Sequence, residues 1–270
     1  MSVVPPRDAG ATAQRIADAL SGGSAAAEKT IFYVDLNAVS PTTVRAIAGI
    51  FVTARVPVNF IDGCILGAPP RPKKPNAGSG HSSVTTATLQ DDDEGTEWSQ
   101  PNIPVSGPHQ LSLLPDGAQI AKALKLRSVS PEIGAASGLK MCFAAITKGF
   151  LGLVTQSFTT AHRLGVTDEL MRELGDVAPD KLASAEKLAP DMPPKAYRWI
   201  KEMEEISDTM HDDGGWSKDL FRGLADVYRS VAEDEVLGKE KIGKRKRGTT
   251  IADLAAAMAE GLERKRKKTE

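Results

Sequence analysis

The apolar residues in the first part of the chain follow two different periods. Short runs rich in β-branched and aromatic residues predict strands at 30–35, 58–62 and 126–129. Between these runs, apolar residues recur at helical spacing and predict helices at 8–20, 40–54 and 116–124. The opening Ser2-Val3-Val4 has the pattern of a buried strand that enters a loop at Pro5 and Pro6. Strands that alternate with helices in this way indicate a parallel α/β sheet.

Beyond residue 130 the pattern is helical throughout, and no further strand is predicted. The longest predicted helix, at 137–163, is about 40 Å long at a rise of about 1.5 Å per residue. That length suits the central helix of a helical domain. Shorter helices are predicted at 167–174, 179–187, 195–210, 217–234 and 250–263.

These patterns divide the chain into three parts: an α/β domain at 1–130, an all-helical domain at 131–238 and a basic tail at 239–270. Within the first part, residues 71–102 change in composition to Pro, Lys, Gly, Ser and Thr, with an acidic run at 91–94. Because this stretch has almost no apolar periodicity, we predict a disordered surface insertion.

Composition excludes several classes of protein. The 34 Lys and Arg residues and 35 Asp and Glu residues leave a net charge of −1, which does not favour a general nucleic-acid binder. Two cysteines without a CxxC motif and four histidines without metal-ligand spacing predict neither a disulfide framework nor a metal site. The longest apolar stretch, Met141–Val154, is shorter than the roughly 20 residues that span a bilayer. We therefore expect a soluble, cytoplasmic protein with no membrane segment and no signal peptide.

The tail is basic within a chain that is otherwise close to neutral. Two clusters, Lys244–Arg247 and Arg264–Lys268, flank its predicted helix. Such clusters are found in nuclear import signals and nucleic-acid patches, but a solvated extension is the interpretation that the sequence favours. The sequence leaves these alternatives open.

Several motifs occur in the order found in β-hydroxyacid dehydrogenases. They are Tyr33–Pro41, Phe60–Pro70, Ser106-Gly107-Pro108 and Ser137–Met141 with Thr147-Lys148-Gly149, followed by Met192–Trp199 and Glu202–Ile206. The chain resembles the branch of this superfamily that carries a phosphogluconate dehydrogenase-type C-terminal domain. The resemblance covers most of the chain apart from the insertion and the tail.

The resemblance implies a Rossmann-type NAD(P)-binding domain, incomplete here, joined to a helical 6-phosphogluconate dehydrogenase-like domain, with a small-molecule substrate between them. It also implies NADP or NAD as the cofactor and a homodimer formed through the helical domain. Lys140 occupies the position of the family's proton-transfer lysine. Desolvation in a closed cleft would bring the pKa of such a lysine toward the range that suits a general acid or base. The implied activity is hydride transfer on a small hydroxy acid or related carbonyl compound.

The resemblance assigns cofactor binding to Val4, Pro5 and Pro6 at the end of the opening strand, and to Asn37 and Ser40. The last two lie after a strand and at a helix N-terminus, where side-chain oxygens and free amides meet cofactor groups. Simple helix capping is the alternative.

Substrate binding is assigned to Gly63, Gly67 and Thr147. Glycines permit close approach of the backbone to a ligand, although any turn after a strand could use them. Thr147 lies about 20° from the helical face of Lys140, so it either lines the cleft or packs against neighbouring side chains. Lys148 lies about 80° from that face, which favours a role at the helix surface or toward another subunit.

Two features depart from the family pattern. Many relatives place Asn four residues after the catalytic lysine, where this chain has Ala144. The family also begins with a G-x-G-x-x-G turn that binds the pyrophosphate, and this sequence contains no such motif. We therefore expect an N-terminally shortened chain that lacks the first βαβ units, about 60 residues. The alternative to an enzyme is a non-catalytic remnant that acts through its helical dimerisation domain.

Overall fold

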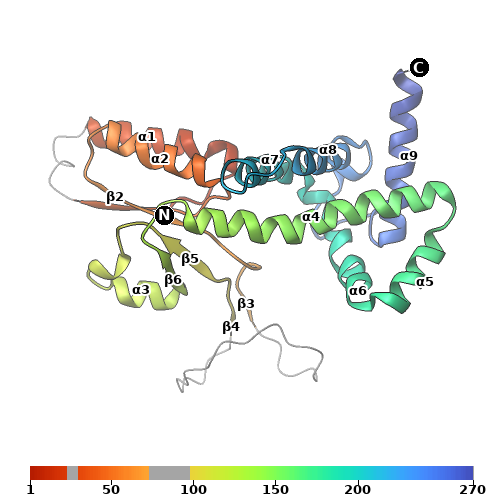
Figure 1. Ribbon diagram of the computed structural model, residues 1–270, viewed down its shortest axis with the longest axis horizontal. Coiled ribbons are helices and arrows are strands. Elements are labelled where there is room, and N and C mark those ends of the chain that lie inside the picture. The colour runs from red at the N-terminus through yellow and green to blue at the C-terminus, as the bar shows by residue number, and fades with distance from the viewer. Residues whose placement is uncertain (23–29, 73–97, 270) are drawn as a thin grey trace.

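The computed structural model describes residues 1–22, 30–72 and 98–269. An α/β part stands at one end and a helical part at the other, and the long helix α4 (Ala135–Leu164) runs through both (Figure 1). This arrangement confirms the predicted combination of a small, mostly parallel sheet with an all-helical domain.

The main sheet has the order β1-β2-β5-β6, formed by β1 (Ile31–Asp35), β2 (Val58–Gly63), β5 (Ile103–Ser106) and β6 (Leu126–Ser130). The pairs β1–β2 and β5–β6 are parallel, whereas β5 runs antiparallel to β2. The sequence did not predict this reversal. The chain between β2 and β5 forms no crossover helix within the described residues. It re-enters the sheet at the same end at which β2 leaves it, so β5 runs antiparallel to β2.

The opening residues extend this sheet beyond β1. The Ser2 amide donates to the Val34 carbonyl at 2.8 Å, and the Leu36 amide donates to the Ser2 carbonyl at 3.0 Å. Ser2 thus pairs in parallel with Asp35, as the interpretation of residues 2–4 as a strand end requires.

Two helices, α1 (Ala9–Ser21) and α2 (Pro41–Thr53), follow the opening segment and β1 and share one hydrophobic core with them. The rings of Tyr33, Phe51 and Phe60 form the centre of this core, with centroids 4.7 to 6.1 Å apart. A shorter helix, α3 (Gly117–Ala123), precedes β6.

The predicted insertion is ordered at both ends. Strand β3 (Arg71–Pro72) pairs antiparallel with β4 (Trp98–Ser99), and Leu66 bridges to Asn102. The prediction of disorder was therefore wrong for these end residues, which backbone pairing holds despite their poor apolar pattern. The rest of the predicted insertion, residues 73–97, lies outside the described residues.

The helical part begins with α4 and continues with α5 (Thr167–Val177), α6 (Pro179–Leu188), α7 (Ala196–Asp212), α8 (Asp219–Glu233) and α9 (Ile251–Thr269). Short 3-10 helices occur at Pro6–Asp8, Leu111–Leu113, Ala189–Asp191, Pro193–Lys195 and Leu237–Lys239. A single apolar core joins these helices, and Met141, Met203, Tyr228 and Leu254 are among its buried members.

Helix α9 was expected within a separate basic tail, but it is packed into this core. Ile251, Leu254 and Met258 are buried there. Its basic end is held by acidic residues of the preceding segment: Arg264 pairs with Asp234 at 3.2 Å. Lys265 and Lys268 likewise pair with Glu233 and Glu235. These charges therefore belong to the folded surface of the helical domain.

Among the described residues, α4 is long enough and apolar enough to cross a membrane by length and composition alone. In this structure it instead packs against α7, α8 and α9 and contributes Met141, Leu151 and Phe158 to the common core. It also carries Lys140 and Lys148. These contacts are those of a central core helix, in agreement with its predicted role.

Candidate functional site

A cavity of about 550 Å³ lies where the two parts of the chain meet. One wall consists of residues 3–7 and of residues 36–38, which follow β1, and the other consists of six residues of α7: Tyr197, Arg198, Ile200, Lys201, Glu202 and Glu204. The cavity brings together four of the predicted cofactor-binding residues: Val4, Pro5, Pro6 and Asn37.

Asn37 builds the wall of the cavity through its own side-chain bonds. Its Oδ1 accepts the Val4 amide at 2.7 Å, and its Nδ2 donates to Asp35 Oδ2 at 2.9 Å and to Ser2 Oγ at 3.2 Å. Burial raises the pKa of Asp35 to about 6. Asn37 thus ties the opening segment to the end of β1, and its predicted contact with a cofactor stays a prediction.

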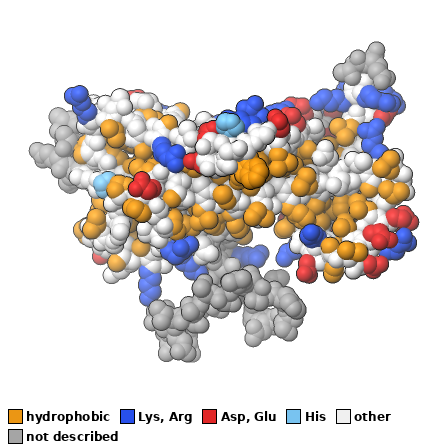
Figure 2. All heavy atoms as spheres, viewed as in Figure 1, with side chains coloured by type: hydrophobic (Ala, Val, Ile, Leu, Met, Phe, Trp, Pro, Cys, Tyr) orange, Lys and Arg blue, Asp and Glu red, His pale blue; other side chains and the backbone are white. Residues whose placement is uncertain are grey.

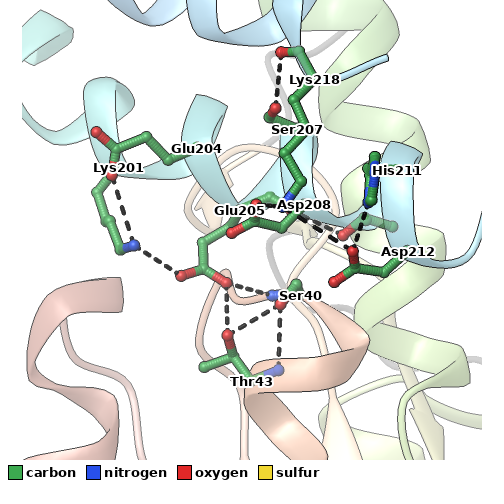
Figure 3. Close-up of polar contacts among 11 residues, drawn as sticks. Ser40, Thr43, Lys201, Glu204, Glu205, Ser207, Asp208, His211, Asp212 and Lys218 are labelled. Atoms are coloured by element: carbon green, nitrogen blue, oxygen red, sulfur yellow. Dashed lines mark hydrogen bonds and ion pairs between the residues drawn. The ribbon is translucent and has the colours of Figure 1, made fainter. Parts of the chain in front are cut away.

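Ser40 caps α2, since its Oγ accepts the Thr43 amide at 3.1 Å. The backbone amide of Ser40 donates to Glu205 Oε2 at 2.8 Å, and the Thr43 hydroxyl donates to the same oxygen at 2.8 Å (Figure 3). Glu205 is buried on α7 and also pairs with Lys201 at 3.1 Å. The N-terminus of α2, predicted to face a cofactor, therefore binds a carboxylate of the helical domain and joins the two parts of the chain.

Lys140 lies near the start of α4, and its Nζ donates to the Ile65 carbonyl at 2.7 Å. Burial lowers the pKa of Lys140. In the described part of the chain no carboxylate forms an ion pair with it. The environment therefore favours the uncharged amine more than water does, as the predicted acid–base role requires.

The carbonyl that Lys140 contacts belongs to the loop between Gly63 and Gly67, both predicted to bind substrate. A Cβ at Gly63 would lie 2.7 Å from a methyl carbon of Leu36, so the packing of the strand end requires glycine there. Gly67 has a φ of +124°, a conformation that side chains rarely adopt. The structure thus brings Lys140 to the predicted substrate loop, while the substrate role of the two glycines stays a prediction.

Thr147 is exposed, and its hydroxyl donates to the Phe143 carbonyl of its own helix at 3.1 Å. Lys148 is the buried one of the two neighbours, with a side chain 16% exposed. It pairs with Glu202 on α7, and its Nζ lies 5.3 Å from the ring centroid of Trp199. Lys148 therefore points into the junction between α4 and α7, contrary to the surface or intersubunit position that its helical angle favoured.

Asp62, at the end of β2, was missed as a positioning residue. Its Oδ2 accepts the amides of Gly134 and Ser137 at 2.9 and 3.2 Å and the Ser106 hydroxyl at 2.9 Å. Its Oδ1 accepts the Ser137 hydroxyl at 2.6 Å. Asp62 thus caps α4 from the sheet and fixes the helix turn that precedes Lys140. The sequence signal was an acidic residue within an otherwise buried strand.

Comparison with known families identifies part of the helical domain. Residues 161–231 match the family described as "Domain of unknown function (DUF1932)". This part of the chain is similar to a DUF1932 domain. This domain is the C-terminal domain of β-hydroxyacid dehydrogenase-like proteins, so the resemblance seen in the motifs is confirmed. No curated protein matches this chain in sequence.

Solved structures share the fold over most of this chain. A conserved hypothetical protein from Sinorhizobium meliloti 1021 is 19% identical, with a TM-score of 0.60 over 96% of this chain and 73% of its own. A conserved protein of unknown function, described as structurally similar to 3-hydroxyacid dehydrogenases, is 22% identical, with a TM-score of 0.52 over 86% of this chain and 74% of its own. The 3-hydroxyisobutyrate dehydrogenase of Mycobacterium tuberculosis is 14% identical, with a TM-score of 0.51 over 92% of this chain and 75% of its own.

Proposed function

We propose that the protein is an NAD(P)-dependent oxidoreductase that transfers hydride to or from a small hydroxy acid or related carbonyl compound. The observation that carries this proposal is Lys140, a largely buried amine at the junction of the two domains that donates a hydrogen bond to the backbone carbonyl of Ile65. The fold supports it, because a 3-hydroxyisobutyrate dehydrogenase shares it.

The cavity suits the nicotinamide end of such a cofactor. Val4, Pro5 and Pro6 form an apolar wall for a flat ring, while Lys201 on the opposite wall supplies a cation for phosphate oxygens. The opening segment is fixed by Asn37, so this wall is preorganised. These residues fit one end of the cofactor, while the glycine-rich turn that binds the pyrophosphate in relatives has no counterpart in this sequence.

A bound nicotinamide would supply the hydride acceptor or donor. In the oxidative direction the uncharged Nζ of Lys140 takes the proton of the substrate hydroxyl while the carbon loses hydride and the carbonyl forms. In the reverse direction the ammonium form of Lys140 donates that proton to the carbonyl oxygen. Burial, which lowers the pKa of Lys140, raises the fraction of the amine near neutral pH.

The protein works as a homodimer in this proposal. Leu139, Phe143, Ile146 and Leu153 recur along one face of α4 and are 38, 44, 77 and 49% exposed. Hydrophobic side chains gather along this side of the molecule (Figure 2). A second copy that packs on this row would remove it from water. Ile146→Asp should therefore yield monomers in analytical ultracentrifugation, whereas Val52→Asp, an equally exposed apolar position on α2, should leave the assembly unchanged.

Calorimetric titration of NADPH and NADH into the folded chain tests the function. We expect micromolar binding of at least one cofactor, and Lys140→Ala should retain that binding but lose turnover. Thermal unfolding run in parallel confirms that both proteins are folded. A folded dimer that binds neither cofactor would contradict the proposal and favour the non-catalytic alternative, in which the helical domain acts by assembly.

A further inference from the structure

The junction beside Lys140 holds more positive charge than its acids balance. Lys148 lies within electrostatic reach of both Lys140 and Arg198, and Glu202 is the carboxylate that pairs with it. The nearby Glu204 and Glu205 already pair with Lys201. Arg198 forms no ion pair with any residue that the structure describes, so the charge of Lys148 is balanced by Glu202 while the charges of Lys140 and Arg198 act on it as well.

The geometry holds two of these cations in place. Trp199 and Glu202 fix the Lys148 side chain from α7, and Ala144, one turn earlier on α4, is small and buried. Arg198 precedes Trp199 and lines the cavity, as Glu202 does one turn later. Lys148 therefore stands behind the cavity wall that Arg198 and Glu202 line.

An excess of positive charge in a partly buried position is costly unless an anion compensates it. Burial and the charges of Lys140 and Arg198 lower the pKa of Lys148 to about 7, because both disfavour the charged ammonium. The contact with Glu202 favours the ammonium and opposes this lowering. A carboxylate bound near Arg198 would relieve this repulsion. Binding would then be coupled to retention of the proton on Lys148.

We propose that Lys148 and Arg198 are specificity-determining residues that recognise the carboxylate of the substrate, with Glu202 limiting the strength of that recognition. This inference rests on the proposed oxidoreductase function and names the charge of its substrate. Arg198 contacts the carboxylate at the cavity wall, and Lys148 supports it from behind through its charge.

Tryptophan fluorescence can follow binding directly. Trp98 and Trp216 are exposed, so a Trp98→Phe/Trp216→Phe background leaves Trp199 as the single reporter next to both cations. The probes are glycolate, its neutral amide glycolamide and inorganic phosphate, titrated without cofactor. We expect saturable binding of glycolate and none of glycolamide over the same concentrations.

Variants of the three charged residues should shift this binding in opposite directions. Lys148→Met and Arg198→Met should each weaken glycolate binding about tenfold or more, the usual effect of losing a charge-assisted contact. Glu202→Gln should tighten it, a result that a purely structural role does not predict. Arg198 is exposed, so its variant is expected to fold even if Lys148→Met does not. Lys187→Met, an exposed lysine on α6, is the matched control and should bind as the parent does.

The inference is overturned if glycolate and glycolamide bind alike, if both methionine variants bind glycolate as the parent does, or if phosphate binds and glycolate does not. Because these titrations contain no cofactor, the calorimetric test of NADPH and NADH stays separate. Cofactor binding without selective glycolate binding would refute only the role of Lys148 and Arg198. Loss of cofactor binding in a folded chain would instead refute the proposed function.

Discussion

Removal of the Asp62 carboxylate should destabilise the protein more than almost any other single polar change, because this group joins the sheet to the start of α4. Asp62 is fully buried and accepts four hydrogen bonds, from Gly134, Ser106 and twice from Ser137. Asp62→Ala would leave two buried backbone amides without an acceptor.

The expected magnitude follows from those donors. An unpaired buried donor costs about 1–3 kcal/mol, and the hydroxyls of Ser106 and Ser137 can turn to other acceptors. We therefore expect Asp62→Ala to lower the free energy of unfolding by about 3–5 kcal/mol. Asp62→Asn keeps one oxygen for the amides, and the loss should be about 1–2 kcal/mol, since neutral acceptors bind more weakly than charged ones.

Urea denaturation followed by circular dichroism measures both variants, and unchanged m-values would show that the same transition is observed. Asp18→Ala, an exposed aspartate on α1, is the control and should stay within about 0.5 kcal/mol of the parent. A double-mutant cycle with Ser137→Ala should show coupling, because the two side chains share a bond of 2.6 Å. If the free energy of unfolding of Asp62→Ala lies within about 1 kcal/mol of the parent's, the capping role assigned to Asp62 is wrong.

Three further predictions concern single contacts. Burial raises the pKa of Asp35 from 3.8 to about 6, so the native state retains a proton that the unfolded state releases, and stability falls as the pH rises through that window. Asp35→Asn should therefore flatten the pH dependence of Tm between pH 4 and 6 and raise Tm at pH 8; an unchanged slope would contradict this cause. Glu205→Ala removes the acceptor that links α7 to α2 and should cost about 2–3 kcal/mol in urea denaturation, whereas a loss below about 0.5 kcal/mol would refute the link. A Cβ at Gly152 would lie 2.8 Å from Leu224, so Gly152→Val should lower the free energy of unfolding by about 1–3 kcal/mol. A Cβ at Gly223 meets open space, so Gly223→Ala should raise the free energy of unfolding by about 1 kcal/mol. Equal effects of the two variants would refute the packing argument.

The long helices were predictable because they bury apolar residues that recur at helical spacing. The predicted helix at 137–163 corresponds to α4 at Ala135–Leu164, and the helix predicted at 195–210 to α7 at Ala196–Asp212. Local composition dominates such elements. The antiparallel direction of β5 was not predictable in the same way, since it depends on which edge the chain re-enters and not on the four residues of the strand.

The tail illustrates a second limit. The basic clusters at 244–247 and 264–268 led to the prediction of a separate tail, although small apolar residues lie between them. In the structure Ile251, Leu254 and Met258 complete the helical core. A cluster of basic residues in the sequence does not reveal which acidic residues elsewhere will pair with it, as Asp234 pairs with Arg264.

The candidate site was likewise predictable only in part. The position of Lys140 at the domain junction and the clustering of Val4 with Asn37 at the cavity follow from motif order, which the sequence carries. The roles of Asp62, Glu202 and Glu205 arise from contacts between residues that are 44 to 165 positions apart in the sequence. Acidic side chains of this kind look like solvated surface residues until the fold brings their partners to them.

Turnover by the parent chain and by Lys140→Ala, measured as cofactor oxidation or reduction across a panel of small hydroxy acids and their keto counterparts, tests the central claim most directly. The parent chain should turn over at least one carboxylate substrate. Lys140→Ala should lose about 10²-fold or more of that rate while its cofactor affinity stays the same, because only the proton-transfer group is missing. Equal turnover by the parent and by a folded Lys140→Ala would contradict the assignment of Lys140, and with it the chemistry proposed for this protein.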